Sequence, residues 1–219
     1  MAFVNISKPS GLAPVTTLSG SDWTGKGRMY AIPISDATNN YFPGDLVTLP
    51  STPGGGDING LPLCTMYTAG TRPVIGVIQS VGINPQGGPY INPNDLSKTY
   101  APITKTVPYY AFVLDDPNII YEIQETGAST NLTTAVVGLN ATIVLGAATT
   151  AAVPGVFVSQ TQLNNAVAPT TTLTLPLKIM SLAQRPDNHF QTSPTTGGGS
   201  QKWWVILNNH FYSQRPTIS

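Results

Sequence analysis

The stretch TVPYYAFVLDDPNIIYEIQE, residues 106–125, decides the fold class. Its second half, residues 119–124, alternates between two faces with the period of two that is typical of a half-buried strand. Residues 109–114 are aromatic and β-branched enough to form a strand that is buried on both sides. The sequence Asp-Asp-Pro at 115–117 separates them, and its proline cannot donate to a strand ladder. The stretch therefore predicts two β-strands joined by a tight corner.

The paired carboxylates of Asp115 and Asp116 have two interpretations. Either side chain can accept hydrogen bonds from nearby backbone N–H groups, which is typical of a turn. A calcium site is the alternative, but calcium usually takes six or more oxygen ligands, and no EF-hand spacing surrounds the pair. We therefore expect a turn.

Other strand-like segments are distributed along the chain between stretches rich in Gly, Pro, Asn and Ser. They cover residues 29–34, 46–49, 61–67, 74–81, 142–145, 155–158, 170–180 and 202–209. The clearest alternation is in residues 170–180, where Leu173, Leu175, Leu177 and Ile179 share the face that we expect to lie in the core. Residues 131–140 are the best helix candidate, limited to a turn or two by their threonines, valines and glycine. The pattern predicts an all-β fold, a single barrel or sandwich over residues 21–219 with at most one short helix.

Residues 1–20 differ from the remainder of the chain. They hold one charge and two prolines, and their periodicity is poor. The segment is too apolar for a simple solvated tail, so we expect an extended N-terminal arm that docks on another surface; a disordered terminus is the alternative. The arm's candidate interface residues are Phe3, Val4, Ile6 and Leu12, and Trp23 is expected to anchor it.

Composition restricts the class of function. The 219 residues carry a formal net charge of zero, and only 9% are charged, against about 25% in an average protein. No basic stripe is present, so direct nucleic-acid binding is not expected. Few charges also leave few groups that keep a surface free of partners. The 41% hydrophobic content with near-zero net charge argues against disorder.

The sequence offers little for catalysis, metal binding or membrane insertion. Cys64 is the only cysteine, which excludes an internal disulfide and a Cys-based zinc site, and we expect it to be a buried apolar residue. His189 is expected to be a solvated loop residue. Neither a secretion signal nor a run of about 18 apolar residues is present, so no membrane span is predicted. We expect a protein that is not an enzyme and uses no cofactor or metal.

Adjacent tryptophans in residues 202–209 must point to opposite faces of a regular strand. Trp203 shares its face with Val205 and Leu207, an apolar row that we assign to the core. Trp204 shares its face with Ile206 and then with polar residues. Such a mixed face is typical of contact with a partner, so Trp204 is a candidate interface residue; coverage by the same chain is the alternative.

Several segments together resemble a family of tailed-bacteriophage virion proteins encoded near the major capsid protein. The segments, in this order, are residues 11–49, VLDDPNIIYEIQE, VGLNA, LTLPLKIMSLAQRPDNHF and KWWVILNNHFY. The resemblance runs over almost the whole chain, although none of the segments is a catalytic motif. The Gly- and Pro-rich loops at residues 51–60 and 84–97 are longer here than the family pattern implies.

The resemblance implies a capsid decoration or cement protein that binds the outer surface of the phage head. Its partner would be the major capsid protein, its location the virion, and its expected state a homo-oligomer, with a trimer favoured. A receptor- or glycan-binding module of a tail fibre or spike is the alternative function. Exposed aromatic residues on the long loops would favour the alternative, and Tyr90 and Tyr100 are the candidates.

Overall fold

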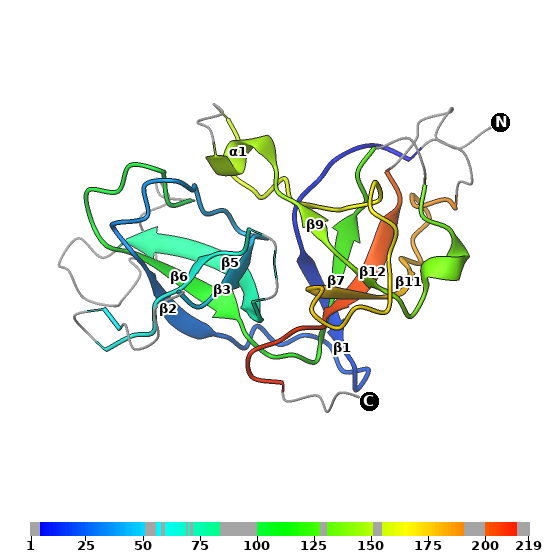
Figure 1. Cartoon of the computed structure of the whole chain (residues 1–219), viewed down its shortest axis with the longest axis horizontal. Coiled ribbons are helices and arrows are strands. Elements are labelled where there is room, and N and C mark those ends of the chain that lie inside the picture. The colour runs from blue at the N-terminus through cyan, green and yellow to red at the C-terminus, as the bar shows by residue number, and fades with distance from the viewer. Residues whose placement is uncertain are drawn as a thin grey trace.

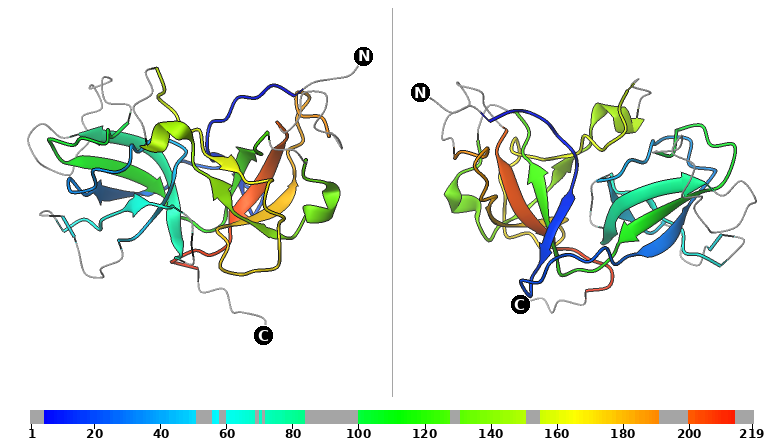
Figure 2. Two further views of the ribbon diagram at one scale, coloured as in Figure 1. Left: turned by 45° about the horizontal axis from the view of Figure 1, so that its top comes forward. Right: turned by 180° about the vertical axis from the view of Figure 1, so that it is seen from behind.

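The computed structural model describes residues 5–50, 56–57, 60–68, 70, 72–83, 100–127, 131–150, 155–190 and 200–213. The predicted all-β class is confirmed, because antiparallel strands make up nearly all of the regular structure. Two five-stranded sheets lie side by side (Figures 1 and 2). Over the described residues, no helix is long and apolar enough to cross a membrane.

The first sheet has the strand order β1-β7-β12-β11-β8, and every pair in it is antiparallel. Its strands are β1 (Ala13–Thr17), β7 (Ile119–Gln124), β8 (Asn140–Ala141), β11 (Leu177–Leu182) and β12 (Lys202–Leu207). The two strands with the strongest apolar patterns, β7 and β12, are neighbours at its centre. Strands β1 and β12 of this sheet are about 190 residues apart in the chain, so the sheet can form only when both segments are present.

The second sheet has the order β2-β6-β5-β3-β4. Its strands are β2 (Arg28–Ile32), β3 (Leu46–Thr48), β4 (Thr65–Met66), β5 (Val74–Ile83) and β6 (Tyr109–Leu114). Strand β6 is therefore interior in this sheet, whereas β7, which follows it in the chain, is interior in the first. The predicted strand–corner–strand unit is confirmed, and it carries the chain from one sheet to the other (Figure 1).

Four small elements complete the regular structure of the described residues. Strands β9 (Ile143–Val144) and β10 (Gln162–Leu163) pair with each other, and α1 (Ala147–Thr150) is a single helical turn above the space between the sheets in Figure 1. The helix of a turn or two predicted over residues 131–140 is present only as a single 3₁₀ turn, η1 (Thr134–Val136). The β-branched residues around it disfavour a longer helix.

Two apolar clusters form the core. The larger one contains residues of both sheets, among them Tyr121, Ile179 and Trp203 from the first and Val77 and Leu114 from the second. The other covers the opposite side of the second sheet. Cys64 is fully buried there, as expected, and burial raises the pKa of its thiol to about 12.

One predicted strand is absent, and another begins later than predicted. Residues 155–158 form a turn, and Phe157 is exposed. The strand predicted over residues 170–180 begins only at Leu177, as β11. Leu177 and Ile179 are buried as predicted, whereas Leu173, which was expected in the core, is 50% exposed. The carbonyls of Leu173 and Leu175 accept hydrogen bonds from the side-chain amide of Asn208 instead of from a strand ladder.

The expected arm over residues 1–20 is corrected by the structure. Residues 13–17 are strand β1, which pairs with β7 along the edge of the first sheet. Leu12 is only 2% exposed and belongs to the larger core cluster, so it is not an interface residue. Residues 1–4, which include Phe3 and Val4, lie outside the described residues. This part of the chain is therefore a component of its own fold.

Candidate functional site

The surface that best combines apolar and charged groups is the outer face of the first sheet. We use this name for the side of β7 and β12 that carries Ile120, Glu122, Lys202, Trp204 and Ile206, opposite to the core side. Ile206 itself is buried, with 3% of its surface exposed. Cross-strand pairing places Trp204 beside Glu122, and Ile206 beside Ile120. Trp203 on the other side is completely buried, which confirms its assignment to the core.

Trp204 is half-buried, and its indole Nε1 is enclosed without a hydrogen-bond partner in the structure. On the neighbouring strand β11, Trp204 is paired with Ser181, which follows a β-bulge after Ile179. Large aromatic side chains are common interface anchors, and Trp204 is one that is partly open. Whether a partner covers Trp204 remains a prediction.

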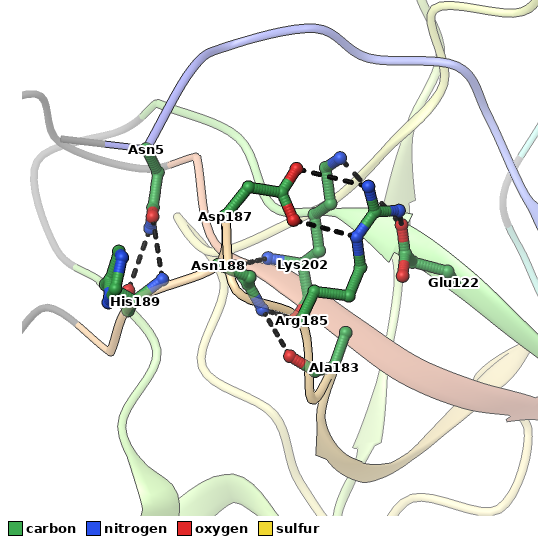
Figure 3. A network of polar contacts seen from close by, with 8 residues as sticks. All are labelled: Asn5, Glu122, Ala183, Arg185, Asp187, Asn188, His189 and Lys202. Atoms are coloured by element: carbon green, nitrogen blue, oxygen red, sulfur yellow. Dashed lines mark hydrogen bonds and ion pairs between the residues drawn. The ribbon is translucent and has the colours of Figure 1, made fainter. Parts of the chain in front are cut away.

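A network of ion pairs, drawn in Figure 3, includes Glu122, which is the cross-strand neighbour of Trp204. The guanidinium of Arg185 donates to Glu122 at 2.9 Å and to both carboxylate oxygens of Asp187, at 2.9 and 3.1 Å. The ammonium of Lys202 lies 3.8 Å from Glu122. Asn188 holds the loop in place, because its amide donates to the carbonyls of Ala183 and Lys202 and accepts the N–H of Lys202. The charges thus have fixed positions.

The N-terminal segment lies across the end of the same sheet. The side chain of Asn5 forms two 2.8 Å hydrogen bonds with the backbone of His189 (Figure 3). The N–H of Lys8 donates to the side chain of Gln124 on β7. Ile6, between these two anchors, is 79% exposed, the largest exposed fraction among the large apolar residues described. His189 is a loop residue, as predicted, but it is half-buried and its backbone is bonded to Asn5.

A hollow of about 350 Å³ opens between the N-terminal segment and β12. Ile6, Lys8, His189 and Lys202 line it, together with Asp187 of the ion-pair network. Its lining therefore contains both an exposed isoleucine side chain and two lysine ammonium groups. It extends the outer face of the first sheet towards the amino terminus.

The four predicted interface residues that the structure describes therefore divide into three groups, whereas Phe3 and Val4 lie outside the described residues. Ile6 and Trp204 are at the outer face of the first sheet, and both are accessible in part. Leu12 is in the core. Trp23 is half-buried at the other end of β7, near Ile119, so the structure does not bring it together with Ile6.

The tyrosines proposed for a receptor-binding surface do not support that alternative. Tyr100 stacks on Phe42 with their ring centroids 5.0 Å apart, and it is half-buried. Tyr90 lies outside the described residues. Among the described residues in or just after the long loop, no tyrosine ring is therefore fully exposed for contact with a receptor or glycan.

Two buried carboxylates were not anticipated from the sequence. Asp45 is fully buried, and it accepts hydrogen bonds from the Phe42 N–H and from the hydroxyls of Ser159 and Thr161. Burial raises its pKa to about 6, although these bonds favour the charged form. Glu125 accepts from the Gln201 amide, the Trp203 indole and the Leu132 N–H, and burial raises its pKa as well.

Asp45 lies where distant parts of the chain meet. Gly11 and Gly44 both have positive φ angles, of 68° and 94°, and they pack against each other beside Ser159. A Cβ atom on Gly11 would lie 2.4 Å from the carbonyl oxygen of Gly44, so only glycine is accommodated there. The hydroxyls that satisfy Asp45 are more than 110 residues away in sequence. The carboxylate thus has a structural role.

The Asp115–Asp116 pair forms the predicted corner, but the two carboxylates bind different partners. Asp116 accepts the N–H and the side-chain amide of Asn118, which confirms the turn. Asp115 instead forms an ion pair with Arg28 and accepts the hydroxyl of buried Tyr30. Among the described residues, no three His, Cys, Asp or Glu side chains are grouped so that they could hold a metal ion.

We expect the two aspartates to respond differently to substitution. Asp116→Asn should change the free energy of unfolding by no more than about 0.5 kcal/mol, because asparagine can cap the same turn. Asp115→Ala should lower it by about 1–3 kcal/mol, since the buried Tyr30 hydroxyl loses its acceptor. Urea denaturation of both variants measures the difference. Equal losses would contradict the separate roles, and a melting temperature that rises with calcium would favour a metal site.

The comparisons with family models, with curated proteins and with solved structures found no match to this chain.

Proposed function

We propose that this chain is a decoration or cement protein of a tailed-bacteriophage head. It binds the outer surface of the capsid, stabilises contacts between subunits of the major capsid protein and has no enzymatic role. The resemblance of its sequence segments to phage virion proteins supports the proposal. The low charge content supports it too, because only 9% of residues are charged.

The observation that carries the proposal is the composition of the outer face of the first sheet. Trp204 lies half-buried beside Glu122, which belongs to the ion-pair network drawn in Figure 3. The exposed Ile6 lines the hollow at the end of the same face. Interfaces commonly have an aromatic anchor in the centre and a polar rim. Among the described residues of the N-terminal segment, Ile6 is the one proposed to take part, since Leu12 and β1 belong to the fold. We propose homotrimers as the bound form, by analogy with cement proteins at threefold positions.

Heads that lack this protein provide the test. We expect purified protein to bind them and to sediment with them, at a copy number comparable with that of the major capsid protein. Trp204→Ala should weaken binding by about 10- to 100-fold, the effect of losing an aromatic hot spot. Ile6→Asp should weaken it in the same direction, because it places a charge on the apolar contact.

Phe157→Ala is the matched control, because Phe157 is an exposed aromatic residue in the turn that follows α1. It should leave head binding unchanged. Normal binding by both Trp204→Ala and Ile6→Asp would show that this face is not the contact. A copy number of only a few per particle would contradict the decoration function itself.

A further inference from the structure

A second hollow, of about 490 Å³, lies at the end of β7 remote from Ile6. The turn after β1, the segment 22–26 and the corner at 116–119 surround it; the turn is dark blue below β1 in Figure 1. An isolated bridge between Thr16 and Asp22 ties the segment to the strand. The volume is within the range of about 300–1,000 Å³ that small-molecule sites occupy.

One wall of this hollow is aromatic. Trp23 packs against the larger core cluster and also lines the hollow, so its ring is held from behind. Ile119, which is buried, supports the same wall. The face of an indole carries negative charge from its π-system, and it attracts the weakly positive C–H groups of a ligand that lies flat on it.

The rim of the hollow is rich in hydroxyl groups. Those of Thr17, Ser19 and Ser21 are hydrogen-bonded to one another at 2.8–3.1 Å, on exposed residues. Each hydroxyl can donate one hydrogen bond and accept two, so the group can exchange bonds with a ligand that has several hydroxyls of its own. On the other side, Asn118 holds one carboxylate oxygen of Asp116 through two hydrogen bonds, of 2.9 and 3.0 Å.

The charges of the lining disfavour an anionic ligand. Asp22 and Asp116 contribute two negative charges and Lys26 one positive charge, so the hollow has a net charge of −1. Two carboxylates are too few for a calcium site. The lining instead suits a molecule that has C–H groups on one face and several hydroxyls around its ring. The C–H face would lie on the aromatic wall, and the hydroxyls would bond to the hydroxyl and carboxylate acceptors. We propose that this hollow binds a neutral pyranose sugar, with its C–H face on Trp23.

The inference concerns the isolated chain and does not depend on the proposed capsid role. We expect a dissociation constant on the order of 1 mM for single sugars, because one ring makes few contacts. The probes are the methyl pyranosides of glucose, galactose, mannose and N-acetylglucosamine. Saturation-transfer NMR on the ligands and the indole N–H shift of Trp23 report binding. At least one probe should bind saturably and shift the Trp23 signal.

Two substitutions test the location. Ser21→Arg introduces a long side chain at an exposed rim position and should weaken binding at least tenfold without loss of the fold. Ser35→Arg, at an exposed serine after β2, is the matched control and should bind normally. Methyl glucuronide, which differs from methyl glucoside by a carboxylate, should bind more weakly than methyl glucoside.

Failure of all four neutral pyranosides to bind would overturn the proposal. Unchanged binding by Ser21→Arg, or tighter binding of the glucuronide, would overturn it as well. These measurements contain no phage heads, so a negative result would leave the decoration function standing. Conversely, a protein that binds sugars and ignores heads would refute only the decoration function.

Discussion

Trp203→Ala is expected to lower the free energy of unfolding by about 3–5 kcal/mol, the usual range when a large aromatic residue is removed from a core. Trp203 has no exposed surface, and it packs in the larger cluster with residues of both sheets. Its indole N–H also donates to Glu125 at 3.2 Å. The substitution therefore leaves a cavity and removes one of the donors that stabilise a buried carboxylate.

The adjacent tryptophan is the matched control. Trp204→Ala should cost much less, because Trp204 is half-buried and its Nε1 has no partner to lose. Urea denaturation followed by far-UV circular dichroism compares both variants with the original protein. A loss of similar size in the two variants would mean that Trp204 is also part of the core. The outer face of the first sheet would then lose its proposed anchor.

The stability of the protein is expected to fall by up to about 3 kcal/mol as the pH rises from 4 to 7, through Asp45 alone. Its pKa is about 6 in the folded state, above the 3.8 that is usual for an aspartate in an unfolded chain, because burial disfavours the charged form. Between these values the folded state binds more protons than the unfolded state, so raising the pH favours unfolding. The difference of about two pKa units corresponds to about 3 kcal/mol.

Other carboxyl groups modify the total. Burial raises the pKa of Glu125, which adds a contribution of the same sign. Partial burial also acts to raise the pKa of Asp36, but hydrogen bonds from Tyr41 and Thr38 outweigh it, so its net pKa is lowered and its contribution is opposite. A substitution at Asp45 is therefore needed to isolate the effect.

Asp45→Asn should remove the Asp45 contribution and flatten the pH profile. An asparagine oxygen can accept the Phe42 N–H, while its NH₂ group donates to the hydroxyls of Ser159 and Thr161, which rotate to accept. Denaturation midpoints measured from pH 4 to 7 give the profile. Asp22→Asn, at an exposed position, should retain the original slope. A slope unaffected by Asp45→Asn would show that this carboxylate does not titrate in that range.

The fold class was predictable because the strongest strands are encoded locally. Residues 109–114, 119–124 and 202–207 have patterns that identify strands β6, β7 and β12, and the corner between the first two follows from Asp-Asp-Pro. The assignment of Trp203 to the core needed only the alternation along β12. Local period-two patterns therefore sufficed at the centres of both sheets.

The errors occurred where a distant contact decides the structure. Residues 170–176 alternate like a strand, but the amide of Asn208 binds the carbonyls of Leu173 and Leu175, and Pro176 has no N–H for a ladder. Residues 13–17 look irregular, yet β7 supplies an edge with which they pair. The network around Asp45 had no local signal, because its hydroxyl partners lie more than 110 residues later.

The position of β12 has a consequence for synthesis in the cell. β12 lies between β7 and β11, and its pairing completes the first sheet only when residue 207 has left the ribosome. Beyond it, the chain crosses to the second sheet, where the N–H of Phe211 donates to the carbonyl of Val74. Until then β1 and β7 have no stable environment, and their apolar sides stay exposed. Fragments of this chain that end before residue 207 should therefore aggregate or be degraded, because they lack β12.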